Sequence, residues 1–273
     1  MADTPNEADS GWQQGQRLLD RYEVIEALQD ASTLQLYRLR ATDEGKLVLA
    51  LRPKARLLQR EGATKWFDYL ARQLMSVPEH KNLLPCERLE YDGNVPILIM
   101  PNVEGPDCAT AVATRALTNL SAILNVAHGV AGALAWLHSH GWIHYNVKPA
   151  NVLLGGQGAV KVFKYGLTGA RTRAYASPEQ MMSETPLTPA TDIWSWAATV
   201  LEMFTGGVTW PLGVVVPDAL ARYREEGPTR IDIPPMPDEM ADLLDECLQK
   251  QIESRPNAAQ VVKRLEAISP EGA

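Results

Sequence analysis

The stretch His144-Tyr145-Asn146-Val147-Lys148-Pro149-Ala150-Asn151-Val152-Leu153-Leu154 decides the fold of this chain of 273 residues. Its first eight residues place a histidine, a lysine and two asparagines around one proline, and an apolar run follows. This composition is typical of a polar turn that leads into a short strand. Upstream, apolar residues recur at helical spacing up to Gly141 and predict a long central helix that feeds the turn; they are Ile123, Val126, Ala127, Val130, Leu134 and Leu137.

The turn resembles the catalytic loop of protein kinases, whose pattern is H-R-D-L-K-P-x-N followed by an apolar run. The resemblance covers residues 15 to 268. Among the protein kinases, the chain is similar to the bacterial Hanks-type Ser/Thr kinases. It implies an α+β, bilobal protein-kinase-like fold with a small, mainly antiparallel β lobe carrying one helix and a larger, mainly α-helical lobe. We expect a disordered tail at 1–15, an N-lobe at 16–104, a C-lobe at 105–268 and a tail at 269–273.

By this resemblance, Lys148 and Asn151 are retained members of the catalytic loop, and Asn146 stands where an Asp accepts the proton of the substrate hydroxyl. A neutral amide has no basicity near neutral pH, so Asn146 cannot act as that base. The loop therefore keeps its lysine and its metal-binding asparagine while the general base is missing.

Lys164 lies at the position of the Asp that holds Mg²⁺ in the family. At about 4 Å and an effective dielectric constant of about 20, a carboxylate attracts a divalent ion by roughly 8 kcal/mol, and an ammonium group repels it by as much. We therefore expect no metal site. Two interpretations stay open: Lys164 is a surface side chain at the end of a strand, or it joins Arg52 and Lys148 in filling a cleft with positive charge.

In the N-lobe, Gln29, Ala31 and Leu34 align with the three glycines of the phosphate-binding turn. Glycine lets the backbone approach phosphates, whereas these side chains crowd the same space. The turn is therefore either an occluded nucleotide site or an ordinary hairpin. The alignment also puts Arg52 in place of the ATP-binding Lys, and the two are not interchangeable at a tight site.

The partner carboxylate of that lysine, on the following helix, has no clear counterpart, since the alignment puts Ala71 there, or Asp68 if the loop is longer. We expect no standard Lys-Glu pair. Met100 corresponds to the gatekeeper and Val103 to the hinge residue. The residues expected to line a vestigial nucleotide cleft are Gln29, Ala31, Leu34, Ala50, Arg52, Met100, Val103, Leu153 and Lys164.

Other family positions have structural roles. Glu179 with Arg255 resembles the ion pair that ties the activation segment to the lower lobe, and Asp192 resembles the anchor of the catalytic-loop backbone. His144 and Tyr165 resemble two members of the spine that links the lobes. Residues 167–176, which follow Tyr165-Gly166 and include Thr168, form a segment too short for a substrate-binding platform.

Composition excludes some function classes. A formal charge of −7 and a pI near 5.3 argue against a nucleic-acid-binding face. Three cysteines, Cys86, Cys108 and Cys247, show no metal or disulfide spacing and favour a reducing, cytoplasmic location. No apolar run approaches the length of a membrane span, and the acidic N-terminus lacks the features of a signal peptide.

The sequence therefore predicts a catalytically inactive protein-kinase-like domain, a pseudokinase. We expect it to act as a protein-binding scaffold or allosteric regulator in bacterial signalling, with no enzymatic activity, no metal, and absent or very weak binding of Mg-ATP. Two alternatives remain. One is a nucleotide-binding enzyme that transfers a nucleotidyl or other group, and the other is a residual, metal-independent kinase.

Overall fold

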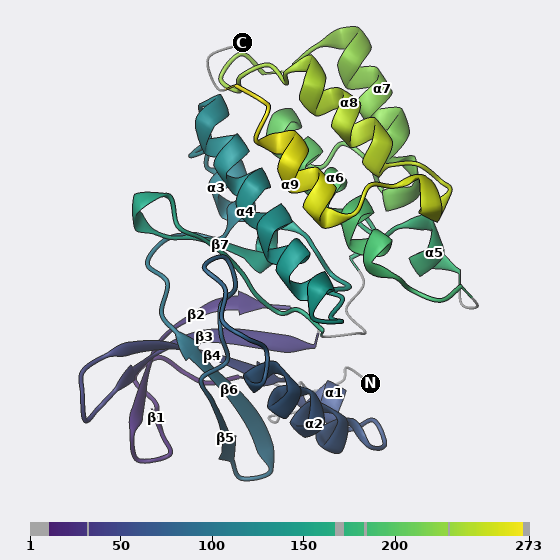
Figure 1. The fold of residues 1–273 in the computed structure, drawn as a ribbon. Coiled ribbons are helices and arrows are strands. Elements are labelled where there is room, and N and C mark those ends of the chain that lie inside the picture. The colour runs from purple at the N-terminus through teal and green to yellow at the C-terminus, as the bar shows by residue number, and fades with distance from the viewer. Residues whose placement is uncertain (1–10, 32, 167–171, 183–184, 229, 270–273) are drawn as a thin grey trace, which may run out of the picture. The chain divides into compact units, whose positions relative to one another are not determined.

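The computed structural model describes residues 11–31, 33–166, 172–182, 185–228 and 230–269 (Figure 1). The chain divides into two compact units. Residues 1–79 and 84–103 form the first, called the N-lobe, and residues 80–83 and 104–273 form the second, called the C-lobe. Residues 80–83 were expected in the N-lobe but group with the C-lobe, because Leu83 pairs with Val162 and the Asn82 Nδ2 atom donates to the Val160 carbonyl at 3.0 Å.

The N-lobe is a six-stranded antiparallel sheet with the strand order β1-β2-β3-β4-β6-β5. Buried and half-buried positions alternate over residues 22–25 at the start of β2, as expected for a strand that covers a core with one face. The helix α2 contributes buried side chains at three- and four-residue spacing. The elements are β1 (Arg17–Leu18), β2 (Tyr22–Asp30), β3 (Leu34–Ala41), β4 (Leu47–Pro53), α1 (Ala55–Leu58), α2 (Ala63–Met75), β5 (Arg88–Asp92) and β6 (Val95–Pro101).

One face of this sheet carries a buried apolar cluster that includes Trp12, Tyr22, Tyr37, Ala50 and Ile99. The Trp12 main-chain N–H donates to the Tyr37 hydroxyl at 3.1 Å, and the two rings lie 4.8 Å apart. The expected tail at 1–15 is thus wrong for its last part, because Trp12 is buried in the sheet. Residues 1–10 lie outside the described residues.

The C-lobe is built around α4 (Leu120–Ser139) and α6 (Pro189–Thr205). Asn119 caps α4 by accepting the Ala122 N–H at 2.8 Å, and Gly141, with φ of 77°, follows its C-terminal end as predicted. The Trp196 indole N–H donates to the Ala127 carbonyl at 3.0 Å and joins α6 to α4.

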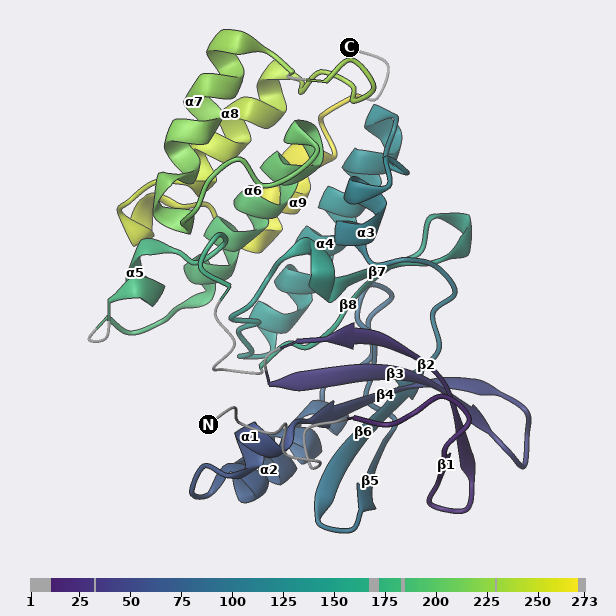
Figure 2. The ribbon, with the colours of Figure 1, turned by 180° about the vertical axis from the view of Figure 1, so that it is seen from behind.

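The remaining elements of the C-lobe pack around this helix pair or form short connections. Figure 2 shows the C-lobe helices from behind, with α7 beside α8. The two short strands β7 and β8 form an antiparallel pair on either side of a tight connection. These elements are α3 (Cys108–Ala113), η2 (Pro149–Asn151), β7 (Val152–Leu154), η3 (Gly156–Gly158), β8 (Val160–Val162), α5 (Pro178–Met181), η4 (Gly213–Val215), α7 (Val216–Glu226), α8 (Asp238–Cys247), η5 (Ile252–Ser254) and α9 (Ala258–Leu265).

Among the described residues, α4 is the one helix with the length and apolar composition of a membrane span, contrary to the expectation that no apolar run approaches that length. More than half of its most apolar window, 56%, is buried inside the structure. A helix that forms the core of a lobe meets the same criteria, so α4 is accounted for by packing.

Candidate active site

Asp192, in the first turn of α6, anchors the turn that contains His144 and Tyr145. Its side chain is fully buried. One carboxylate oxygen accepts the His144 N–H at 2.7 Å and lies 2.9 Å from His138 Nε2, and the other accepts the Tyr145 N–H at 2.8 Å. Tyr145 has a φ of 66°, a conformation that non-glycine residues adopt at a cost and keep only where the surroundings impose it. The Asp192 carboxylate supplies that constraint.

Within the turn, hydrogen bonds tie Asn146, Asn151 and Phe163 together. The Asn151 Nδ2 atom donates to the Asn146 carbonyl at 2.8 Å, and the Phe163 N–H donates to the Asn151 carbonyl at 3.1 Å. The Asn146 N–H donates to His144 Nδ1 at 3.2 Å. The segment that follows β8, with Lys164 at φ of 61°, is thereby held beside the turn.

The two lysines of the candidate site share one environment. Lys148 Nζ donates to the Thr172 hydroxyl at 2.7 Å, and burial lowers the Lys148 pKa. Burial also lowers the pKa of Lys164, to about 7, helped by the nearby Lys148 charge and opposed by Asp107. Although Lys164 keeps part of its surface exposed, this pKa does not fit a side chain in open water. Lys164 is thus partly buried near Lys148 and is not a fully exposed side chain at the end of a strand.

Glu179 and Arg255 form a buried bidentate ion pair, with N–O distances of 2.7 and 3.0 Å. The Thr191 hydroxyl also donates to Glu179, at 3.0 Å, and the Arg255 guanidinium lies 5.0 Å from the Trp194 ring. Sequence reasoning had singled out the pair but not these supporting contacts.

Other predicted residues of the C-lobe lie in or beside the turn. The rings of His144 and Tyr165 lie 6.4 Å apart at 63°, and Leu153 is buried in β7. Sequence reasoning missed Gln180, whose Nε2 atom donates to the Tyr145 carbonyl at 2.8 Å. Residues 167–171, and with them Thr168 of the expected activation segment, lie outside the described residues.

In the N-lobe, the strand register puts Leu36 on a different face of the sheet from Ala50 and Arg52, two residues expected to line the nucleotide cleft. Leu36 pairs with Leu51, whereas Ala50 and Arg52 pair with Tyr37 and Gln35. Directly opposed residues of neighbouring strands share a face, and successive residues of a strand point to opposite faces. Leu36 therefore lies on one face of the sheet, and both Ala50 and Arg52 lie on the other.

The same rule places Met100 on the face of Leu36. Met100 pairs with Leu49, which is two residues from Leu51 and so shares its face. Leu51, a residue that the sequence reading did not select, thus joins Leu36 and Met100. Alternation along one strand does not identify it, because Leu51 and Met100 lie on different strands and the register between β4 and β6 relates them.

Arg52 instead packs against the N-terminal segment. Its guanidinium lies 4.9 Å from the Trp12 ring, and its Nε atom is buried without a hydrogen-bond partner. Asp68 of α2, which the alignment offered as a possible partner for the cation at position 52, instead pairs with Arg72 at 3.0 Å and accepts a hydrogen bond from the Tyr91 hydroxyl. Ala71, the other aligned residue, is fully buried. The structure does not bring Arg52 to the face that carries Met100.

This placement predicts the effect of replacing Arg52 with methionine. Methionine keeps an apolar side chain of similar length over Trp12 and removes the unsatisfied Nε, so we expect a stability change of under about 2 kcal/mol. The dissociation constant for ATP should stay within about twofold, because the side chain lies on the opposite face from Met100. Isothermal titration calorimetry and urea denaturation measure both quantities. A tenfold loss of ATP affinity in a folded variant contradicts the assignment of faces.

The connection between β2 and β3 is described except for residue 32. Gln29 belongs to β2 and Leu34 to β3, and the Ala31 N–H donates to the Leu34 carbonyl at 3.0 Å. Lys54 Nζ lies 2.7 Å from the Asp30 carboxylate. These are the contacts of a closed hairpin. Val103 ends the N-lobe shortly after β6.

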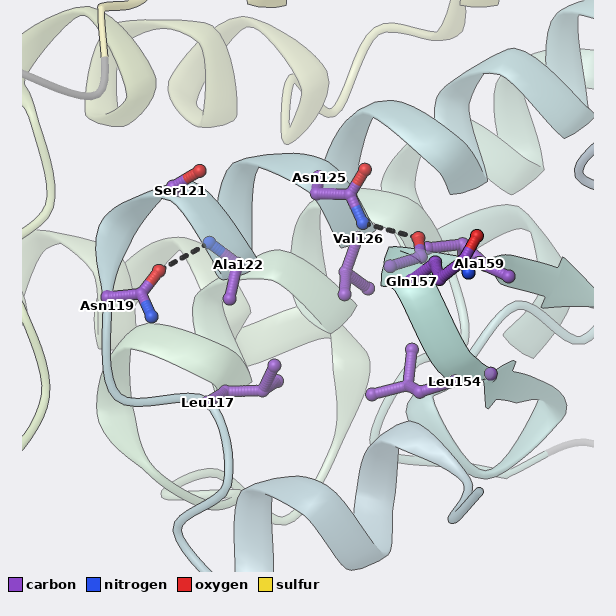
Figure 3. A pocket seen from close by; sticks show the side chains of 12 residues that line it. Leu117, Asn119, Ser121, Ala122, Asn125, Val126, Leu154, Gln157 and Ala159 are labelled. Carbon is purple, nitrogen blue, oxygen red and sulfur yellow. Dashed lines mark hydrogen bonds between the residues drawn. The ribbon is translucent and has the colours of Figure 1, made fainter. Parts of the chain in front are cut away.

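A separate pocket of about 440 Å³ lies in the C-lobe, between the start of α4 and the β7–β8 connection (Figure 3). The Asn125 Nδ2 atom closes one side by donating to the Gly158 carbonyl at 2.8 Å. The side chains that line the pocket are neutral and therefore offer no charge for a phosphate group. They belong to Leu117, Asn119, Ser121, Ala122, Asn125, Val126, Leu154, Gln157, Ala159 and Val160.

Comparisons with known proteins agree with this architecture. Residues 69–265 match the family described as the protein kinase domain. The chain is 32% identical over 213 residues to serine/threonine-protein kinase PkaB of Streptomyces coelicolor, a match that covers 70% of this chain and 50% of PkaB. Serine/threonine-protein kinase PkaA of the same organism is 27% identical, with 70% of this chain and 37% of PkaA covered. The chain thus spans half the length of these curated relatives or less.

Solved structures confirm the predicted fold. The kinase domain of Mycobacterium tuberculosis PknI superposes with a TM-score of 0.72 at 17% sequence identity, and the match covers 94% of this chain and 99% of that domain. At this identity the likeness shows the fold alone. An antiparallel N-lobe sheet and a helical C-lobe are what the sequence predicted.

The family comparison corrects two predictions. The expectation of a domain without enzymatic activity is contradicted, because the matching family is the protein kinase domain and the relatives are curated serine/threonine-protein kinases. The expectation of no cofactor is contradicted too, because such kinases normally use Mg-ATP. That expectation rested on departures from the family pattern at single positions, among them Asn146, Lys164 and Arg52. With its family match, its relatives and its fold in agreement, the chain belongs to the protein kinase domain family.

Proposed function

We propose that this domain transfers the γ-phosphoryl group of ATP to a serine or threonine hydroxyl of a protein partner in bacterial signalling, in the cytoplasm. The single observation that carries the proposal is the anchoring of the turn at residues 144–151 by the buried Asp192 carboxylate. That anchor holds Lys148 and Asn151 on one rigid turn. Phosphoryl transfer depends mainly on such positioning and on charge neutralisation.

In this reaction the substrate hydroxyl oxygen bonds to the γ-phosphorus, and the bond from that phosphorus to the bridging oxygen breaks, so ADP leaves. Asn146 cannot accept the hydroxyl proton, because a carboxamide is not basic at neutral pH. The proton therefore passes to a phosphate oxygen or to water. Lys148 and Lys164 supply positive charge toward the phosphates.

The donor set of the site fits phosphate oxygens rather than a metal held by the protein. Lys164 is a cation, and the part of the chain that the structure describes contains no group of three or more His, Cys, Asp or Glu residues able to hold a metal ion. Mg²⁺ is commonly carried by substrate phosphates and water with one or two carboxylates. Mg²⁺ would therefore be held by the nucleotide's own phosphates and would neutralise part of their charge.

The expected turnover is slow. Protein kinases typically turn over at about 1–100 s⁻¹, and the lack of a general base costs roughly 10²- to 10⁴-fold, which leaves roughly 10⁻⁴ to 1 s⁻¹. This rate is measured with radiolabelled ATP and a protein substrate rich in serine and threonine, in long incubations with Mg²⁺, Mn²⁺ or EDTA.

Lys148→Met should lower the rate by about 10²-fold, as the loss of one positioned donor does in other enzymes.

The matched control is Lys263→Met, which removes an exposed lysine from α9 in the same lobe and should leave the rate unchanged. Incorporation that is equal in the wild type and in Lys148→Met points to a contaminating kinase. No incorporation under any metal condition overturns the proposed function.

A further inference from the structure

Gln180, in the short helix α5, uses both ends of its amide group. Its Oε1 atom accepts the Ser177 N–H at 3.0 Å and completes the capping box of α5. Its Nε2 atom donates to the Tyr145 carbonyl at 2.8 Å. Gln180 is only 2% exposed, so water competes little for these bonds. One side chain therefore joins α5 to the turn that contains Asn146.

Tyr145 precedes Asn146, and side chains from outside the turn hold both polar groups of its main chain. The buried Asp192 carboxylate accepts the Tyr145 N–H at 2.8 Å, and Gln180 donates to the Tyr145 carbonyl. That carbonyl shares a planar peptide group with the Asn146 N–H, which donates to His144 Nδ1 at 3.2 Å. The bond from Gln180 therefore helps to fix the orientation of the peptide that leads into Asn146.

The segment that leads to Gln180 is itself held in place. The carbonyls of residues 173–175 accept hydrogen bonds of 2.7, 2.7 and 2.8 Å from the Gly213 N–H, the Trp210 indole and the Ser195 hydroxyl. At the start of the segment, the Thr172 hydroxyl accepts a hydrogen bond from Lys148. Residues 172–180 are thus tied to the turn at both ends, by Lys148 and by Gln180.

We propose that Gln180 is a positioning residue for phosphoryl transfer, because its amide donor orients the peptide between Tyr145 and Asn146. This inference rests on the proposed function. A reaction that depends on placement loses about 10²-fold in rate for a displacement of about 1 Å. Loss of the donor should therefore lower kcat. The KM for ATP should change less than about twofold, because Gln180 acts through the main chain of the turn.

Gln180→Glu separates the two bonds of this side chain. A carboxylate still accepts the Ser177 N–H, since glutamate serves in capping boxes as glutamine does, but it has no donor for the Tyr145 carbonyl. The protonated carboxyl group regains a donor. Burial raises the pKa of such a carboxyl, and the Asp192 charge favours the neutral form too, while the Lys148 charge opposes it. The ion pair of Glu179 and Arg255 carries no net charge.

The test compares kcat in each variant with kcat in the wild type, from about pH 8 to about pH 5.5, with radiolabelled ATP at saturation. At the upper pH, Gln180→Glu should be slower by about 10²-fold. The ratio should recover by about tenfold or more as the pH falls, because protonation restores the donor. Gln180→Met has neither donor nor acceptor and should stay slow at every pH.

Hydrogen exchange followed by mass spectrometry gives a readout that does not depend on activity. Fragments that cover residues 144–151 should exchange faster in Gln180→Glu than in the wild type at about pH 8, and this difference should shrink at about pH 5.5. The matched control is Gln260→Glu. Gln260 occupies the same capping position in α9, where it is exposed and accepts the Asn257 N–H at 2.8 Å. This control should match the wild type in both kcat and exchange.

Equal kcat in the wild type and in Gln180→Glu at about pH 8 overturns the inference and leaves the proposed function standing. A ratio that stays constant with pH, or a loss confined to KM, also overturns it, because the donor is then not what sets the rate. If the wild type transfers no phosphate, the proposed function falls and exchange decides alone. Faster exchange that low pH reverses supports the positioning by Gln180, and unchanged exchange overturns it. If Gln180→Glu does not fold, the same comparisons with Gln180→Met decide.

Discussion

Replacement of Arg255 by alanine is expected to lower the free energy of unfolding of the C-lobe by about 3–5 kcal/mol. Arg255 donates to both carboxylate oxygens of Glu179, and the side chains of the pair are 0% and 3% exposed. Without the guanidinium, Glu179 stays buried with an uncompensated charge, because the remaining hydroxyl donors, such as that of Thr191, are neutral. The cost is that of an unpaired buried carboxylate rather than of the ion pair itself.

Urea denaturation followed by tryptophan fluorescence measures this loss. The matched control is Arg264→Ala, which breaks a bidentate pair with Glu246 whose side chains are 45% and 48% exposed. An exposed pair is worth about 0–1 kcal/mol, so the control should change stability little. Equal losses in the two variants contradict the argument that burial sets the cost.

Replacement of Asn146 by aspartate is expected to raise the rate of phosphoryl transfer by roughly 10²- to 10⁴-fold. The substitution adds a carboxylate that can accept the hydroxyl proton. It leaves intact the hydrogen bonds that shape the turn, because the Asn151 Nδ2 atom and His144 Nδ1 contact only the main chain of residue 146. Initial rates with radiolabelled ATP, compared at saturating nucleotide, measure the gain.

Asn257→Asp is the control for this gain. It makes the same chemical change at the exposed N-cap of α9, where aspartate caps as well as asparagine, so rate and stability should match the wild type. A gain in both variants points to an effect of net charge. If Asn146→Asp transfers phosphate no faster than the wild type, the missing base is not what limits this domain.

Much of the C-lobe was predictable because its signals are local. The helical spacing that ends at Gly141 predicted α4, and the polar turn before an apolar run predicted the segment that leads into β7. Motif matches also singled out Asp192 and the pair of Glu179 and Arg255, each of which depends on a few residue types at fixed spacing.

Function was harder to predict than fold. Asn146 and Lys164 each remove a familiar chemical group, and together with the altered phosphate-binding turn and Arg52 they led to the prediction of a protein without activity. A substitution at one position shows what that side chain cannot do, but it does not show what neighbouring side chains do in its place. The family and its curated relatives point to an enzyme instead.

The polar turn, its anchors and, through the family resemblance, the kinase-like architecture could therefore be predicted from the sequence, since short motifs act within one segment of chain. The face of the sheet that each N-lobe residue occupies follows from the strand register, which the sequence did not show. A strand alternates at every residue, so one step in register moves Arg52 from the face of Met100 to the face of Trp12. Only the tertiary structure brought Lys164 to Lys148, because the charge and burial that shift an ammonium group come from segments distant in sequence.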